Sequence, residues 1–241
     1  MKVLILAAGP DDVTIPGRGY PVALSEFDGH PLIELTLRSV AELQDARVIC
    51  AIREEESPRS HLDNIIKLID PTIEVLRVRH GTAGAACTAL LAIDHIDDDE
   101  LLILNANEIL DADFPTIVHA FRSSSATAGV VVFPAVHPRY SYVRIEGGLV
   151  IEAAEKRPIS RSATAGFYWF RHGDEFVAGA MRMISKEASV GGLFYICPVL
   201  NELILDGKDV QTFAVQPSSY HPLKDDRQVY RYETNAGERR Q

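Results

Sequence analysis

The sequence has little positive charge and no long hydrophobic segment. Its 241 residues carry 24 Lys and Arg against 34 Asp and Glu, which gives a net charge of −10. A general nucleic-acid binder or membrane-surface protein would need a basic face, so we expect neither partner. No apolar run approaches the ~20 residues that span a bilayer. No basic region precedes such a run at the N-terminus, so we also expect no signal peptide.

Cysteine is scarce as well. Cys50, Cys87 and Cys197 are odd in number, far apart and in apolar surroundings. This usage predicts buried free thiols in a reducing compartment, and therefore a cytoplasmic protein. Because no CxxC pair and no close Cys/His cluster occur, we expect no zinc site.

The first half of the chain alternates short apolar runs with helical patterns. Strands are predicted at residues 3–7, 46–52, 73–78 and 100–105. Helices are predicted from Pro31 onward and at residues 57–69, 82–96 and 115–121. This alternation is typical of a parallel, doubly wound sheet, whose ligands bind at the carboxyl ends of the strands. The loop after Ala7 is therefore the first place to look for a function.

The second half changes character but contains no repeat, low-complexity tract or linker. Strands are predicted at residues 129–134, 163–170 and 210–215, with a hairpin of residues 140–145 and 149–154 around Gly147-Gly148. Helices are predicted at residues 173–186 and 195–205. Together the two halves predict an α/β protein of one domain, residues 1–241, with a mixed, mainly parallel central sheet flanked by helices.

Four stretches of the sequence carry a resemblance to a known family. They are LILAAG with DGHPLIELTLRSV, then GTAGAACTALLAI, then LLILNANEILDADF, and last SYVRIEGGLVIEAAEKRPIS with ATAGFYWF and FYICPVLNELILDGK. They resemble the sugar-nucleotidyltransferases, in the branch found beside capsule and surface-polysaccharide genes. The resemblance spans residues 1 to about 215. It implies a Rossmann-like fold of the GT-A type, with residues 1–122 binding a nucleotide and residues 123–235 binding an acceptor.

The resemblance also implies a reaction. A sugar 1-phosphate, or a similar small phosphorylated acceptor, would attack the α-phosphorus of a nucleoside triphosphate and release pyrophosphate. Mg²⁺ held by carboxylates would bridge the phosphates. The implied partners are a nucleoside triphosphate or nucleotide sugar and the acceptor, in surface-polysaccharide biosynthesis, and the sequence leaves a homo-oligomer open.

On the nucleotide side, the resemblance assigns two loops and a strand end. The nucleotide-binding residues it implies are Ala7, Ala8, Gly9, Gly81, Thr82 and Asn105. The alternatives are structural, since the first loop could be a strand-ending turn and Thr82 could be a helix N-cap.

On the acceptor side, Glu155 and Lys156 match the family pair that contacts the acceptor's hydroxyls and its phosphate, so Lys156 is also a candidate catalytic residue. The other acceptor-binding candidates are Tyr142, Gly166 and Asn201. Glu155 and Lys156 could instead form a surface ion pair, and Asn201 could cap a buried helix or hold a metal.

Three departures from the family pattern cluster on the triphosphate side. Pro10-Asp11-Asp12 stands where the family has a small-residue loop and an arginine, Val22 where it has a lysine, and Asn107 where it has the metal-binding aspartate. Losing one such charge contact costs on the order of 3 kcal/mol of transition-state stabilisation. Arg18 could replace the lost cation, and Glu108 could join Asn107 as a metal ligand.

Two functions therefore remain. The breadth of the resemblance favours a working nucleotidyltransferase with an altered triphosphate site. The alternative is a catalytically inactive relative that binds a sugar phosphate or nucleotide, or serves as a partner subunit. The clustering of the departures on one side of the site favours the alternative, but the breadth of the resemblance places the nucleotidyltransferase slightly ahead.

Overall fold

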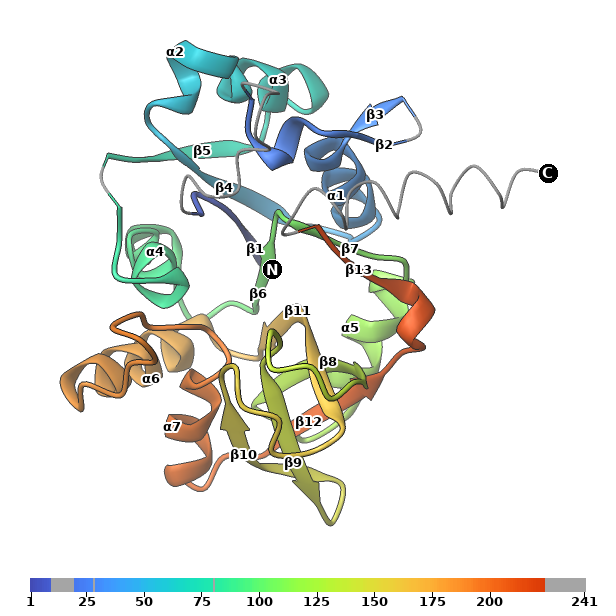
Figure 1. The fold of residues 1–241 in the computed structure, drawn as a ribbon, viewed down its shortest axis with the longest axis vertical. Helices are drawn as coiled ribbons and strands as arrows, with labels where there is room; N and C mark the ends of the chain where they lie inside the picture. The colour runs from blue at the N-terminus through green and yellow to red at the C-terminus, as the bar shows by residue number, and fades with distance from the viewer. Residues whose placement is uncertain (10–19, 28, 80, 224–241) are drawn as a thin grey trace.

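The computed structural model describes residues 1–9, 20–27, 29–79 and 81–223 (Figure 1). Pro10-Asp11-Asp12 and the candidate Arg18 lie outside these residues. None of the helices within the described ranges is long and apolar enough to cross a membrane.

A nine-stranded mixed sheet runs through both halves of the chain. Its first part is parallel, in the order β5 (Glu74–Val78), β4 (Arg47–Arg53), β1 (Lys2–Ala7), β6 (Leu101–Asn105). The long strand β11 (Ser162–Phe170) pairs antiparallel with β6 and carries the rest of the sheet. That part consists of β8 (Ala128–Pro134), β9 (Tyr142–Glu146), β10 (Leu149–Ala154) and β12 (Val210–Ala214). The predicted fold class is confirmed.

Helices cover both faces of the sheet (Figure 1). One apolar cluster joins Val3 and Ile5 to α1 (Leu32–Ala41), α3 (Leu62–Ile69) and α5 (Phe114–Ser123). The alternate residues Leu4 and Leu6 belong to a second cluster with α4 (Ala85–Leu90), α6 (Gly173–Ser185) and α7 (Val199–Leu205). Successive side chains of a strand point to opposite faces, so a continuous apolar run such as β1 fills two cores.

Two short ribbons and three 3-10 turns also occur within the described residues. The ribbons are β2 (Glu26–Phe27) with β3 (His30–Pro31) and β7 (Glu108–Leu110) with β13 (Tyr220–Pro222). The 3-10 turns are η2 (Val22–Leu24), η3 (Ile93–His95) and η4 (Pro217–Ser219).

Three predicted helices differ from the structure. The helix at 57–69 is two helices, α2 (Glu56–Ser60) and α3, because His61 between them adopts a left-handed conformation with φ of 57°. The helix at 82–96 ends as α4 at Leu90 and is followed by η3. The helix at 195–205 begins only after Pro198, since proline fits a helix only at its start.

Candidate functional site

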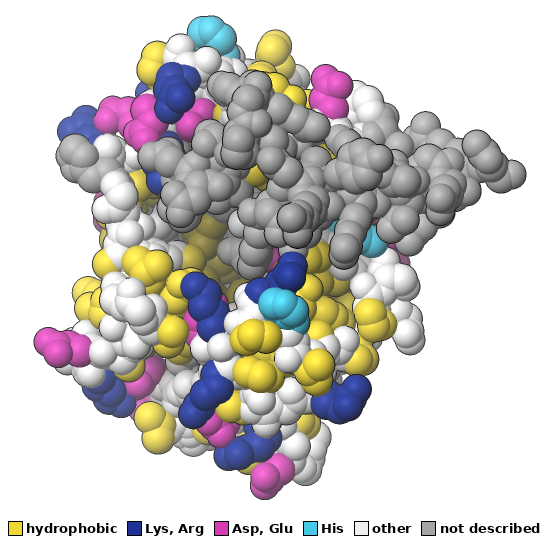
Figure 2. Space-filling model, in the orientation of Figure 1, with side chains coloured by type: hydrophobic (Ala, Val, Ile, Leu, Met, Phe, Trp, Pro, Cys, Tyr) yellow, Lys and Arg dark blue, Asp and Glu magenta, His cyan; other side chains and the backbone are white. Residues whose placement is uncertain are grey.

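The carboxyl ends of β1 and β6 meet at the centre of the parallel sheet. Leu6 pairs with Asn105, and the Ala106 amide donates to the Leu6 carbonyl over 3.1 Å. Ala7 and Ala8, half-buried, and the exposed Gly9 follow directly. Figure 2 shows a hollow on this face, between α4 and these strands, with Lys and Arg side chains on the half of the face below it. The nucleotide-side candidates of β1 and β6 thus lie together.

Arg53, which was not predicted from the sequence, holds Gly9 just after the end of β1. Its Nε donates to the Gly9 carbonyl over 2.5 Å, and its Nη1 lies 3.0 Å from Glu55 Oε1. Arg53 ends β4, the neighbour of β1 in the sheet. Its position at a strand end beside β1 was the available signal.

The loop before α4 is shaped by a close approach to Phe194. Gly84, not Thr82, is the N-cap of α4, with φ of 108°, and a Cβ there would overlap the Phe194 backbone. Thr82 Oγ1 hydrogen-bonds Thr88 Oγ1 over 2.5 Å, so the predicted cap by Thr82 is wrong. The exposed Gly81 has open space around its Cα, which leaves room for a ligand beside the loop.

A buried carboxylate lies at the end of β6. Glu108, 7% exposed, accepts from Asn105 Nδ2 over 2.6 Å and from the Tyr220 hydroxyl. Burial next to this carboxylate raises the pKa of Tyr220 well above its ordinary value. Gly166 has φ of 67°, and a Cβ there would overlap the carboxylate of Glu108. Gly166 therefore makes room for Glu108, which accounts for a glycine inside a buried strand.

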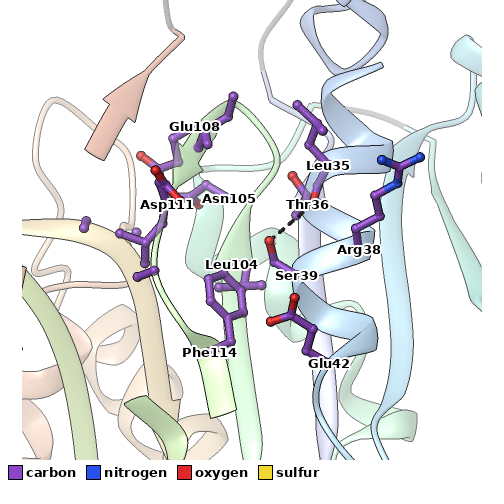
Figure 3. A pocket seen from close by; sticks show the side chains of 15 residues that line it. Leu35, Thr36, Arg38, Ser39, Glu42, Leu104, Asn105, Glu108, Asp111 and Phe114 are labelled. Atoms are coloured by element: carbon purple, nitrogen blue, oxygen red, sulfur yellow. Dashed lines mark hydrogen bonds between the residues drawn. The ribbon is translucent and has the colours of Figure 1, made fainter. Parts of the chain in front are cut away.

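Asn105, Glu108 and Gly166 line a pocket of about 360 Å³ between α1 and the β6–β7 segment. In Figure 3, Thr36 and Ser39 of α1 lie across from Asn105, Glu108 and Asp111. Both hydroxyls donate to carbonyls of their own helix, Thr36 to Leu32 and Ser39 to Leu35. The pocket floor is apolar and its walls are polar, which suits a ligand with both hydroxyl groups and C–H faces.

The residues at this strand end do not fit a divalent metal ion. Asn107 offers a neutral amide, and both oxygens of Glu108 already accept hydrogen bonds. Within the described ranges, no group of three His, Cys, Asp or Glu side chains is placed to hold a metal. Mg²⁺ prefers several oxygen ligands including carboxylates. The expectation that Asn107 and Glu108 hold Mg²⁺ therefore finds no support in the described contacts and stays a prediction.

Val22 lies in an apolar cluster. It is 5% exposed and packs in one cluster with Phe27, Leu32 and Leu223, of which Leu223 is fully buried. The Leu223 amide donates to the Asn107 carbonyl over 3.0 Å. Leu223 thus shares an apolar cluster with Val22 and a backbone hydrogen bond with Asn107, the two described positions that depart from the family pattern.

Lys156 is exposed and held from two sides. It has a left-handed backbone with φ of 53°, and its amide donates to the Tyr140 carbonyl over 3.1 Å. Its Nζ donates to the Tyr195 hydroxyl over 2.8 Å and lies 5.0 Å from the centre of that ring. The hydrogen bond to Tyr195 raises the pKa of Lys156 above its ordinary value. The ammonium group is therefore charged at neutral pH and available to an anion.

Glu155 lies next to a buried cluster of polar side chains that includes Tyr168 and Cys197. It accepts a hydrogen bond from Ser141 Oγ. Nearby, the buried Tyr168 hydroxyl and Thr164 Oγ1 are 2.9 Å apart, and burial raises the pKa of Tyr168 well above its usual range. Cys197, also buried, has its pKa raised by burial first and then by the charge of Glu155. Tyr168 and Thr164 are buried and bonded to each other, so among these groups the half-buried Glu155 is the one that can accept from a ligand hydroxyl.

Tyr142 and Asn201 are placed behind Glu155 and Lys156. Tyr142 is fully buried and donates its hydroxyl proton to the His137 carbonyl over 2.7 Å. Asn201, within α7, accepts from the Ala153 amide and donates to the Ala153 carbonyl, both over 2.8 Å. This two-point contact joins α7 to β10 just before Glu155, so both residues support the segment that presents the pair.

Comparison with known proteins identifies the family. The family model described as nucleotidyl transferase matches residues 14–195, so the chain belongs to the nucleotidyl transferase family. The resemblance predicted from the four sequence stretches is thereby confirmed at the level of the family, and the surface-polysaccharide branch stays a prediction. No curated protein sequence matches the chain.

Solved structures agree over nearly the whole chain. The nucleoside-diphosphate-sugar pyrophosphorylase from Vibrio cholerae RC9 has a TM-score of 0.83 at 19% identity, covering 97% of this chain and 100% of that one. A Bacillus anthracis protein described as a glucose-1-phosphate thymidylyltransferase has a TM-score of 0.77 at 18% identity. The match covers 98% of this chain and 95% of that one. The inositol-1-phosphate CTP transferase from T. maritima has a TM-score of 0.74 at 14% identity. The match covers 98% of this chain and 96% of that one. At these identities the likeness establishes the fold.

Proposed function

We propose that the chain binds a sugar phosphate or nucleotide sugar at the Glu155–Lys156 segment, and that it has lost efficient nucleotidyl transfer from a triphosphate. The observation that carries this proposal is Leu223. It packs in one cluster with Val22 and hydrogen-bonds Asn107, the two described positions where the family pattern has a lysine and an aspartate. In this chain the Val22 side chain serves packing, and Asn107 brings a neutral amide where the family pattern has a carboxylate.

Without a lysine at position 22 and a carboxylate at position 107, the negative charge of a triphosphate would not be neutralised. Pyrophosphate leaves with several negative charges, which nucleotidyl transfer must neutralise. Val22 offers no charge and Asn107 offers only an amide dipole. Each lost charge contact costs on the order of 3 kcal/mol in the transition state, so two together would reduce the rate by roughly 10⁴-fold.

The acceptor side keeps the groups that bind a phosphorylated sugar. The charged Lys156 ammonium suits a phosphate, and the Glu155 carboxylate suits sugar hydroxyls. The names of the structural neighbours mention glucose 1-phosphate, inositol 1-phosphate and a nucleoside-diphosphate sugar. These compounds share a polyhydroxylated sugar or cyclitol that carries phosphate. This is the ligand class we propose.

A second candidate is nucleotidyl transfer itself, to a sugar 1-phosphate and in surface-polysaccharide biosynthesis. The breadth of the family match, residues 14–195, favours it, and the Glu155–Lys156 segment is compatible with both candidates because a binding protein and a transferase need the same acceptor contacts. A partner subunit of an active relative is a variant of the first candidate.

Calorimetric titration tests the binding proposal. The ligands are glucose 1-phosphate, inositol 1-phosphate, UDP-glucose and dTDP-glucose. We expect at least one to bind, and Lys156→Gln to weaken that binding by tenfold or more. The matched control is Lys67→Gln, which removes an exposed ammonium on α3 whose recorded partner is the Pro71 carbonyl. If no ligand binds, or if both variants lose affinity equally, the proposal is wrong.

A further inference from the structure

Two consecutive residues, Phe194 and Tyr195, lie between the loop at Gly81–Gly84 and Lys156. The Phe194 amide donates to the Ala83 carbonyl over 2.7 Å, and its carbonyl accepts from the Ala86 amide over 3.0 Å. A Cβ on Gly84 would overlap the Phe194 backbone, so loop and segment are in direct backbone contact. Any displacement of the loop therefore moves Phe194 with it.

Tyr195 carries the contact onward to Lys156. Its hydroxyl accepts a hydrogen bond from Lys156 Nζ at 2.8 Å, and its ring lies beneath the ammonium at 5.0 Å. Two further donors of the ammonium group remain after this bond, enough for a phosphate. A long, exposed lysine side chain would otherwise sample many rotamers and lose entropy on binding a ligand. Tyr195 reduces that loss by holding Nζ in one place.

We propose that Tyr195 is the positioning residue for Lys156, and that Phe194–Tyr195 couples the loop at Gly81–Gly84 to the phosphate-binding ammonium. The assignment of these two sites to a nucleotide and a phosphorylated sugar rests on the proposed function. The link itself rests on the contacts of Phe194 with Ala83 and Ala86 and of Tyr195 with Lys156. A ligand beside the loop would change the position of the ammonium, and a ligand on the ammonium would change the loop to the same energetic extent.

The first test needs no ligand. The chain has six lysines, so ¹³Cε-labelled lysine gives a simple spectrum in which Lys156→Gln identifies one signal. Tyr195→Phe keeps the ring and removes the hydroxyl. We expect the pKa of Lys156 to fall toward its ordinary value in this variant. Tyr140→Phe is the matched control, because it removes a hydroxyl from the residue whose carbonyl, not side chain, contacts Lys156. An unchanged Lys156 pKa in Tyr195→Phe would overturn the positioning role.

The second test changes the loop at Gly81–Gly84 and measures the ¹³Cε signal of Lys156. Gly84→Ala forces the loop away from Phe194, and Thr82→Val removes the Thr82–Thr88 hydrogen bond and serves if Gly84→Ala does not fold. We expect the Lys156 ¹³Cε signal to shift in the loop variant and to shift far less when Tyr195→Phe is also present. If the loop variant leaves the Lys156 signal unchanged, with Tyr195 present or replaced by Phe, the coupling is overturned.

The affinity for glucose 1-phosphate separates this inference from the proposed function. Where the wild type binds it, Tyr195→Phe should weaken binding by roughly two- to tenfold, the range for one hydrogen bond. A wild type that binds no sugar phosphate contradicts the proposed function but not the spectroscopic link. A wild type that binds and a Tyr195→Phe that binds equally well contradict the positioning role alone.

Discussion

Val22 shows at the residue scale how an apolar environment excludes a charge. It is 5% exposed and surrounded by Phe27, Leu32 and Leu223. We expect Val22→Lys to lower the free energy of unfolding by about 3 kcal/mol or more, because the ammonium would be buried without a partner. Val22→Met, which adds volume without charge, should cost less than Val22→Lys, about 1–3 kcal/mol. Urea unfolding measures both. A Val22→Lys protein as stable as the wild type would mean that the cluster opens readily to solvent.

Gly166 combines two independent constraints at one residue. Its φ of 67° is unfavourable for other residues, and a Cβ would overlap the Glu108 carboxylate. Gly148 has φ of 84° but open space around it, so Gly148→Ala carries the conformational cost alone. We expect about 1 kcal/mol of destabilisation for Gly148→Ala and about 3 kcal/mol or more for Gly166→Ala. Equal losses in chemical denaturation would show that Glu108 moves aside without cost.

The thiols give a prediction about alkaline pH. Burial raises the pKa of Cys50 from 9.0 to about 12. The folded state therefore keeps a proton that the unfolded state releases, so the contribution of Cys50 to stability is complete below pH 9 and disappears as the pH rises toward 12. Unfolding free energies measured between pH 8 and 11 should fall with pH, and less steeply in Cys50→Ala. Cys87, which is less buried, should react with a thiol reagent before Cys50 and Cys197 do.

At the scale of elements, the strands follow from sequence and several helix ends do not. Apolar runs such as residues 3–7 identify strands because they are buried on both faces. The break at His61 could not be found, because periodicity does not report a single left-handed residue. The β7–β13 ribbon was also missed, since its strands are three residues long and come from distant parts of the chain.

The α2–α3 break gives a test at this scale. His61 has φ of 57° and is exposed. Glycine adopts this conformation without steric cost, so we expect His61→Gly to raise the free energy of unfolding by about 0.5 kcal/mol. His61→Ala keeps the Cβ and serves as the control, with no gain expected. If His61→Gly is less stable than His61→Ala in thermal unfolding, the left-handed link is not a source of strain.

At the scale of the whole molecule, the sequence proposes where a site lies but not which residues support it. The loops after β1 and β6 and the Glu155–Lys156 segment are candidates because strand ends and family motifs mark them, and their roles stay predictions. The supporting residues could not be found in this way. Tyr195, Arg53 and Leu223 act through contacts with residues more than thirty positions away in sequence. Such contacts arise only when the chain folds.

The central claim is that this member of the nucleotidyl transferase family binds a phosphorylated sugar without efficient transfer. The most direct measurement is pyrophosphate release by the wild-type protein with Mg²⁺, each of the four ribonucleoside triphosphates or dTTP, and a panel of sugar 1-phosphates that includes any ligand found by calorimetry. We predict no release above the protein-free rate, although a ligand binds. Release that depends on one triphosphate and one acceptor would contradict the claim and establish a transferase.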